Sequence, residues 1–326
     1  MDTIITNYLS KLEFGEPQRF KNMEIIPLFS SLDGSPGYLT LKEALEKGFL
    51  TITEVSRGGS VPELKVENRA EIPVLILDDE ELVGARQNRV LNTTILLKEK
   101  SETVIPVTCT EQGRWSYVSP VFACSDTGLS SELRRRKAAH VTDSLAKSKR
   151  FEADQADMWA GIARMSLGAG VTSPTGAARD VYEARMADLN EYLGAFKCMP
   201  HQKGMLVLVN GEVAGLDLIP LESACKILHP KLVKSYAMDA LLQDEKKCDK
   251  ASPDRAKLFL EEAASSEEAR YDSIGYGRDY RFKGKAIVGS ALVHREKVVH
   301  MAFFRTAGPD KEGQISGYRR PGNFGM

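Results

Sequence analysis

Apolar and polar positions alternate over short segments near the start of the chain, which predicts a strand-rich N-terminal part. Leu50-Thr-Ile-Thr-Glu-Val55 alternates with the two-residue period of a strand that has one buried face. Other apolar or β-branched runs predict strands at 20–29, 64–68, 73–77, 90–97 and 103–108. A small helix is expected at 40–48, with Thr40 as N-cap and Glu43 three residues later. The close spacing of turn signals favours an antiparallel sandwich or a barrel-like sheet.

The pattern becomes helical near Ser130, where Ser130-Ser-Glu-Leu133 is expected to open a helix that carries Arg134-Arg-Arg-Lys137. A second helix is expected over 151–167. Ser173-Pro174 then combines an N-cap residue with proline at the first helical position, which predicts a third helix that runs to about Tyr192. The middle of the chain is therefore expected to be helical.

Strands return in the last third of the chain. Asn210-Gly211 is typical of a two-residue hairpin turn and joins the strands expected at 205–209 and 213–218. Helices are expected at 221–228, 230–242 and 253–264, and final strands at 285–293 and 297–304. Residues 307–326 are rich in Gly, Pro and Arg and predict a flexible tail.

Together these patterns predict an α+β protein that forms one composite domain. Its expected parts are a strand-rich antiparallel N-terminal part at 1–128, a helical segment at 129–195, a second strand-plus-helix part at 196–306 and the tail at 307–326. The segments 75–84 and 207–215 resemble each other as strand, turn, strand and glycine. This similarity has two alternative explanations: a duplicated half-domain, or a chance likeness between two hairpins.

Composition narrows the class of protein. With 42% hydrophobic and 27% charged residues, the 326-residue chain is ordinary for a globular protein. Its net charge of −1 gives no field that would attract nucleic acid or a membrane surface, so neither is an expected partner. No apolar run has membrane-spanning length, and Met1-Asp-Thr-Ile-Ile5 does not begin like a signal peptide. Five scattered cysteines predict reduced thiols and a cytoplasmic location.

Two dense polar runs, 81–89 and 109–117, are the strongest candidates for a functional site. The segments between them are β-branched, and Lys98-Glu-Lys-Ser101 is expected to be a turn. If the segments pair around this turn, Asn88 lies opposite Glu111 and the runs meet at one end of a hairpin. The residues gathered there are Glu81, Arg86, Gln87, Asn88, Arg89, Glu111, Gln112, Arg114, Trp115 and Tyr117.

These residue types suit a small anionic or nucleotide-like ligand. Arg86, Arg89 and Arg114 can fork onto phosphate, supported by the neighbouring amides. Trp115 or Tyr117 can stack on a base. Glu81 and Glu111 are the candidate catalytic residues, as acceptors from ribose hydroxyls or as a general base, and hydrolysis is the simplest chemistry for this set.

The alternative is a non-catalytic scaffold protein in which the same polar runs are structural. A cavity flanked by Arg86, Glu111 and Arg114 would favour a ligand, whereas mutually saturated ion pairs would favour the scaffold. The sequence indicates neither a cofactor nor an oligomeric state.

Other motifs carry weaker indications. Cys198-x-x-His201 and Cys225-x-x-x-His229 mix the ligand order of zinc fingers, so no metal site is predicted. Cys109 is expected to be a buried residue at a strand end. The run 134–137 covers barely one helical turn and is expected to be a solvated helix face.

Three segments carry a resemblance to a known family: Ile52–Leu64, Glu80–Thr94 and Ile105–Tyr117. They resemble the bacterial family called the ARG and rhodanese-phosphatase-superfamily-associated protein domain, and the likeness extends more loosely to the strand near Phe304. The family name refers to ADP-ribosylglycohydrolases and phosphatase-like domains. The resemblance therefore implies a role in NAD or ADP-ribose metabolism, with ADP-ribose as the leading ligand, and it supplies no catalytic residues.

Overall fold

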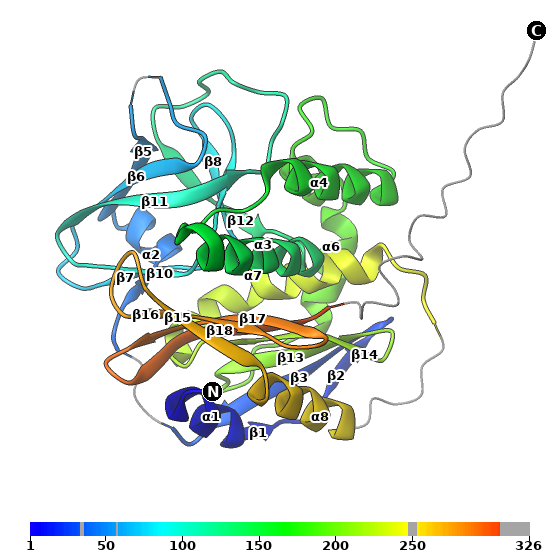
Figure 1. The fold of residues 1–326 in the computed structure, drawn as a ribbon. Coiled ribbons are helices and arrows are strands. Elements are labelled where there is room, and N and C mark those ends of the chain that lie inside the picture. The colour runs from blue at the N-terminus through cyan, green and yellow to red at the C-terminus, as the bar shows by residue number, and fades with distance from the viewer. Residues whose placement is uncertain (33–35, 57, 247–252, 307–326) are drawn as a thin grey trace, which may run out of the picture.

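The computed structural model describes residues 1–32, 36–56, 58–246 and 253–306. A layer of helices lies between a curled N-terminal group of strands and a large antiparallel sheet, and two further helices cover the outer face of that sheet (Figure 1). The protein is therefore α+β, as predicted. None of the described helices is both long and apolar enough to cross a membrane.

The N-terminal strands form two sheets with a shared core. The six-stranded sheet has the order β12 (Phe122–Gly128), β8 (Glu80–Gly84), β9 (Arg89–Leu91), β11 (Ser101–Cys109), β6 (Glu63–Asn68) and β5 (Leu50–Glu54). The three-stranded sheet consists of β10 (Ile95–Leu97), β7 (Val74–Ile76) and β4 (Leu39–Thr40), followed by helix α2 (Leu41–Glu46). Leu50, Ile52, Leu64 and Val107 project from alternate positions into the common core.

The large sheet joins both ends of the chain. It has nine strands in the order β1 (Leu12–Phe14), β3 (Met23–Ser30), β13 (Gly204–Val209), β14 (Glu212–Leu218), β18 (Lys297–Arg305), β17 (Ile287–His294), β16 (Arg278–Lys283) and β15 (Glu267–Asp272), with β2 (Gln18–Phe20) paired to β3. Strand β3, from the predicted N-terminal part, thus pairs with β13 of the predicted second part, while β1 and β2 pair with β3.

Both faces of the large sheet are covered by helices. Helices α1 (Thr3–Ser10) and α8 (Pro253–Ala264) cover the outer face. The inner face packs against a layer of α3 (Ser131–Ser148), α4 (Gln155–Ala169), α5 (Ala178–Ala184), α6 (Met186–Ala195) and α7 (Glu222–Leu241). Met205 and Val207 face this layer, whereas Leu206 and Leu208 face the outer helices. Burial of both faces explains why β13 is continuously apolar.

Several local signals are confirmed. Thr40 and Glu43 form a reciprocal capping box at the start of α2. Asn210 and Gly211 connect β13 to β14 with φ angles of 50° and 78°. Ser130 is the N-cap of α3 and accepts a hydrogen bond from the backbone of Leu133. Short-range hydrogen bonding decides each of these features.

The predicted strand at 90–97 is wrong, because it divides into β9 and β10 in different sheets. β9 pairs with β11, but β10 leaves to pair with β7. The side chains of Thr93 and Thr94 hydrogen-bond to Asp279 and His300 of the large sheet, at 2.6 and 2.8 Å. Contacts with a distant sheet therefore interrupt the strand.

The helix boundaries also differ from the predictions. Helix α4 begins at Gln155 instead of residue 151, and the helix expected to reach Tyr192 divides into α5 and α6. Pro230 lies inside α7 and does not separate two helices. α7 is the most buried of the central helices, so its packing compensates for the backbone hydrogen bond that proline removes. The predicted helix start at Ser173 is wrong, because its hydroxyl caps a turn by accepting from the backbone of Ala177 at 2.8 Å and α5 begins at Ala178.

Six strands were not expected from the sequence: the short strands β1, β2 and β4, and the longer strands β12, β15 and β16. Strands β15 and β16 contain many charged residues and lie at one edge of the large sheet. The proposed likeness between 75–84 and 207–215 is not a repeated hairpin, since β13 pairs with β14 while β7 and β8 belong to separate sheets. The predicted tail at 307–326 lies outside the described residues.

Candidate functional site

The two polar runs meet at one end of the six-stranded sheet, although their register is one residue off the prediction. Arg89 pairs with Cys109, and the backbone of Thr110 donates to the carbonyl of Asn88 at 3.0 Å. Asn88 is therefore opposite Thr110, not opposite Glu111. Five residues at this end share a polar environment and are called here the loop-end cluster: Glu54, Arg86, Arg89, Trp115 and Tyr117.

The outer part of the loop-end cluster is a cation held between aromatic rings. The guanidinium carbon of Arg86 lies 4.4 Å from the ring centroid of Tyr117 and 5.6 Å from that of Trp115. Trp115 and Tyr117 are 44% and 48% exposed, so flat aromatic surfaces remain available to a ligand. Gly59 has a φ of 76°, and a Cβ there would lie 3.0 Å from Cδ of Arg86, so this close approach requires glycine.

Arg89 forms the buried part of the cluster. It is fully buried, and its Nη1 donates to Oε1 of Gln87 at 2.9 Å. Its Nε and Nη2 have no hydrogen-bond acceptor in the described part of the chain. The Trp115 ring centroid lies 5.5 Å from the guanidinium carbon of Arg89. Burial lowers the pKa of Arg89 because the charged form loses hydration.

Glu54 completes the cluster and was missed in the sequence analysis. It is 9% exposed, and neither carboxylate oxygen has a hydrogen-bond donor among the residues described. The alternating pattern contains the signal, because Glu54 continues the inward row of Leu50 and Ile52 on β5. A carboxylate at the next inward position of an otherwise apolar row indicates a special role.

Arg89 and Cys109 continue the inward rows of their strands in the same way. Arg89 follows the row of Leu91, and Cys109 follows the row of Val107. Burial raises the pKa of the Cys109 thiol, and the charge of Arg89 acts against this rise. A carboxylate, a guanidinium and a thiol therefore close one end of the core of the six-stranded sheet.

Arg114 and Glu111 form a saturated ion pair that orders the long loop. Nε of Arg114 lies 2.9 Å from both carboxylate oxygens of Glu111, and Nη1 donates to the carbonyls of Ala85 and Ser116 at 2.8 and 3.0 Å. Nη2 reaches the side chain of Asn88 at 3.1 Å. Ala85 has a φ of 40°, an unusual conformation that these bonds stabilise. These donors are already used by the protein.

The other predicted site residues near Arg114 are also hydrogen-bonded within the protein. Glu111 also accepts from the backbone of Asn88 at 3.2 Å and from Thr175 at 2.8 Å, and Gln87 donates to the carbonyl of Gln112 at 3.3 Å. Burial acts to raise the pKa of Glu111, but the bonds from Arg114 and Thr175 outweigh it and lower this pKa.

Glu81, the other candidate catalytic residue, has no arginine bonded to it in the described part of the chain, in contrast to Glu111. It is buried and accepts from the hydroxyl of Thr110 at 2.8 Å. Burial raises its pKa to about 7. In the described part of the chain, Glu81 and Glu111 share no hydrogen-bond partner.

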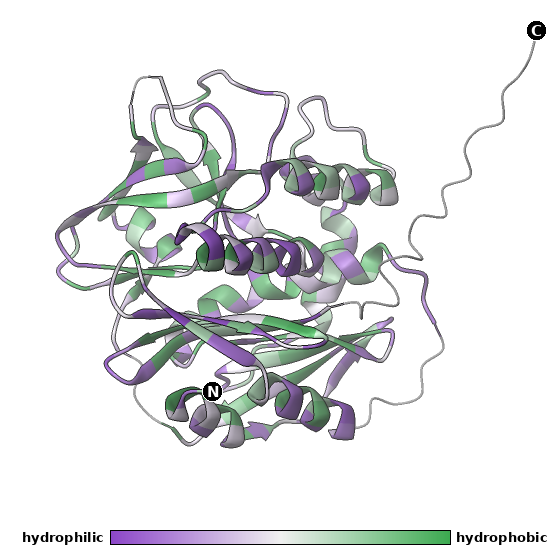
Figure 2. Ribbon diagram, in the orientation of Figure 1, coloured by the Kyte–Doolittle hydropathy of each residue, from purple (hydrophilic) through white to green (hydrophobic). Residues whose placement is uncertain are grey.

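Arg134 and Lys137 contradict the prediction of a solvated helix face, because both are fully buried. Figure 2 shows that α3 is largely hydrophilic although it lies between the two sheets. Arg134 forks onto Asp217 of β14 at 3.0 and 2.5 Å, and its Nε lies 3.6 Å from Asp79. Lys137 donates to the carbonyl of Leu91. Only Arg135 and Arg136, which pair with Glu132, lie toward solvent.

These buried groups form a central charge network, composed of Asp78, Asp79, Arg134, Lys137, Asp217 and His300. Burial lowers the pKa of Lys137 to about 8 and raises that of Asp79. Burial also acts on Asp217, but Arg134 and His300 outweigh it and hold its pKa well below the usual range. The network connects the N-terminal strands, α3 and the large sheet, so we assign it a structural role.

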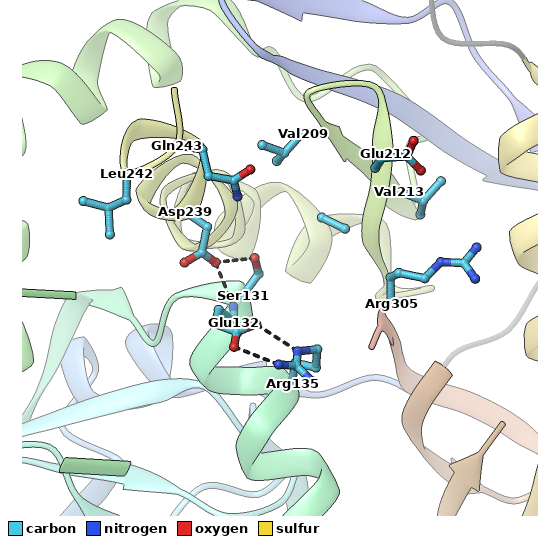
Figure 3. Close-up of a pocket in the computed structure, with 11 residues that line it drawn as sticks. Ser131, Glu132, Arg135, Val209, Glu212, Val213, Asp239, Leu242, Gln243 and Arg305 are labelled. Atoms are coloured by element: carbon cyan, nitrogen blue, oxygen red, sulfur yellow. Dashed lines mark hydrogen bonds and ion pairs between the residues drawn. The ribbon is translucent and has the colours of Figure 1, made fainter. Parts of the chain in front are cut away.

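Several cavities in the described part of the chain lie outside the loop-end cluster. One, of about 360 Å³, lies between the first turn of α3, the end of α7 and the β13–β14 hairpin (Figure 3). Asp239 accepts there from Ser131 at 2.5 Å, and Glu132 pairs with Arg135. A second, of about 600 Å³, lies between α2, β5 and β12 and includes Cys124. Asp239 and Glu132 are thus already paired within the protein.

The cysteine and histidine residues considered for zinc are not arranged as a metal site. Cys198 contacts Cys225, which lowers the pKa of Cys198, and His201 pairs with Glu222 at 3.1 Å. His229 is buried, which lowers its pKa to about 4. Within the ranges that the structure describes, no group of three or more His, Cys, Asp or Glu residues could hold a metal ion.

The fold and the loop-end cluster define a class: an α+β protein in which two antiparallel sheet systems enclose helices and one sheet end presents arginines beside exposed aromatic rings. The chain belongs to the family of the ARG and rhodanese-phosphatase-superfamily-associated protein domain, whose model matches residues 11–304. Comparison with curated proteins and with solved structures finds no match.

Proposed function

We propose that the protein binds a small anionic, nucleotide-like ligand at the loop-end cluster in the cytoplasm, with ADP-ribose as the leading candidate. The observation that carries the proposal is the buried guanidinium edge of Arg89, which has no acceptor among the described residues and lies under the exposed ring of Trp115. A phosphate would supply the missing acceptors. The family name, which associates the domain with ARG proteins, supports the choice of ADP-ribose.

The cluster offers a separate surface to each part of such a ligand. Trp115 and Tyr117 present the faces on which a base can stack. Arg86 and Arg89 place two positive charges beside these rings. Arg114 is not part of this proposal, because its donors hold Glu111 and the loop backbone.

A thermal-shift panel tests this proposal with ADP-ribose, NAD, AMP and inorganic phosphate. A ligand at 100 times its dissociation constant should stabilise the protein by about 2.7 kcal/mol. We expect a shift with a nucleotide for the natural protein, and at least a tenfold loss of affinity in Arg86→Ala. Arg150→Ala is the matched control, since Arg150 is an exposed arginine that pairs with Glu152 away from the cluster. If no compound shifts the unfolding temperature, the scaffold function replaces this proposal.

Hydrolysis of the bound ligand is a second candidate function. Glu81 is the candidate acid or base, because it lies where the two polar runs adjoin and accepts from the hydroxyl of Thr110 at 2.8 Å. A carboxyl group with a pKa of about 7 can exchange a proton at neutral pH. Incubation of the natural protein and Glu81→Gln with ADP-ribose, followed by chromatography of the products, tests this role. Turnover that persists unchanged in Glu81→Gln would exclude Glu81 as the acid or base.

A further inference from the structure

We propose that Glu54 and Arg89 together recognise a phosphorylated sugar, with Arg89 binding the phosphate and Glu54 accepting hydrogen bonds from sugar hydroxyls. This inference rests on the proposed function, because it names the part of the nucleotide-like ligand that the buried end of the cluster holds. It also assigns a binding role to Glu54, which lies outside the two polar runs.

The free edge of Arg89 is the edge suited to an oxyanion. Nη1 is already bound to Gln87, whereas Nε and Nη2, which lie side by side on the guanidinium plane, have no acceptor among the described residues. Two parallel N–H groups match two oxygens of a phosphate or carboxylate. Gln87 holds the third nitrogen and thereby fixes the direction of this fork.

Glu54 supplies hydrogen-bond acceptors beside the donors of Arg89. Both of its oxygens are buried without a donor in the described part of the chain, so they can accept from two neighbouring hydroxyl groups. The charge of Glu54 acts on Arg89, raising its pKa against the effect of burial, so the two side chains are within electrostatic reach of each other. Nevertheless, no ion pair joins Glu54 and Arg89 within the described ranges.

A buried carboxylate and a buried guanidinium that do not pair are costly. A molecule that carries both an oxyanion and hydroxyl groups satisfies them at once. Inorganic phosphate alone would face the negative charge of Glu54, and a neutral sugar would leave the fork of Arg89 empty. A sugar phosphate is the chemical class that meets both needs.

Trp115 covers this pair. Its indole lies over the guanidinium of Arg89, yet it is 44% exposed and belongs to the loop between β11 and β12. Because Arg89 is fully buried, we infer that the ligand displaces the indole as it binds. The chain has two tryptophans, so Trp159→Phe leaves Trp115 as the sole tryptophan reporter.

The test titrates the full chain carrying Trp159→Phe with ribose 5-phosphate, ribose, inorganic phosphate and ADP-ribose, and follows the fluorescence of Trp115. We expect ribose 5-phosphate to bind at least tenfold more tightly than either ribose or phosphate. Addition of Glu54→Gln should remove this preference, and it should strengthen phosphate binding because it removes the negative charge that phosphate faces. Glu63→Gln, an exposed glutamate at the start of β6, is the control and should change neither.

The outcomes separate this inference from the proposed function. Binding of ADP-ribose with an unchanged preference in Glu54→Gln would overturn the role of Glu54 and leave the proposed function standing. No binding of any probe would overturn both. If Glu54→Gln fails to fold, Glu54→Asp replaces it, since the shorter carboxylate should also lose the preference. Arg89→Lys should weaken phosphate binding at least tenfold, and an unchanged affinity would reject the fork.

Discussion

The central charge network and the loop-end cluster both bury arginines and carboxylates, but they satisfy them differently. In the network, Arg134 uses both terminal nitrogens on Asp217, which also accepts from Tyr236 at 2.8 Å. Asp79 has no hydrogen-bond donor among the described residues, but the charge of Arg134 lies 3.6 Å away. In the cluster, Arg89 is equally buried but leaves one edge without an acceptor among the described residues. The comparison teaches that neither the burial of a charge nor a missing hydrogen-bond partner indicates function by itself. At the loop end, the unpaired edge of Arg89 also lies beside the exposed ring of Trp115, which a ligand can reach.

The largest expected effect is on the network. Arg134→Met should lower the free energy of unfolding by about 3–5 kcal/mol, because it leaves Asp217 buried without its main cation. Arg135→Met, the next residue of α3, is the matched control and should cost within about 1 kcal/mol, since its pairing with Glu132 is near solvent. Urea unfolding measures both. Equal effects of the two substitutions would contradict the structural role of the network.

The next effect concerns pH and the difference between Glu81 and Glu111. The folded-state pKa of Glu81 is raised from 4.5 to about 7, so the native state holds a proton that the unfolded chain releases. Its contribution to stability is present below pH 4.5 and is lost as the pH rises through about 7. Glu81→Gln should therefore be more stable than the natural protein at pH 8, by about 3 kcal/mol, with little difference near pH 4. Urea unfolding across this pH range measures the difference, and parallel curves would reject the assignment.

A smaller effect distinguishes the two arginines at the loop end. Arg114→Ala should lower the free energy of unfolding by about 1–3 kcal/mol, because Glu111 loses its ion-pair partner and the carbonyl of Ala85 loses one of its donors. Arg86→Ala should cost about 0.5–1 kcal/mol, which is the value of its stacking on aromatic rings. Thermal unfolding without ligand makes the comparison. A greater stability loss in Arg86→Ala would show that Arg86, not Arg114, orders this loop.

The candidate site could be predicted in part. The sequence analysis identified Arg86, Arg89, Trp115 and Tyr117 from two short polar runs. The pairing of β9 with β11 brings these runs together, although the register differs from the prediction by one residue. Only the hydrogen bonds of the structure distinguish the arginines: Arg114 donates to the backbone of its own loop, whereas Nε and Nη2 of Arg89 have no acceptor among the described residues. A sequence shows donors and acceptors, but their pairing depends on distances between strands.

The features that the sequence alone predicted correctly depend on interactions between residues that are close together in the chain. The capping box of Thr40 and Glu43, the Asn210-Gly211 turn and the bounds of α8 each depend on residues a few positions apart. The family membership also follows from the linear sequence. The α+β class follows from the sum of these short-range patterns.

The tertiary structure alone decided which charges lie inside. Arg134 and Arg135 are adjacent and chemically identical, yet one is fully buried against Asp217 and the other lies toward solvent. The division of 90–97 into two sheets and the continuation of α7 through Pro230 likewise depend on distant contacts. The free energy of burying a charge or a proline is set by the groups packed around it, and those groups come from remote parts of the chain.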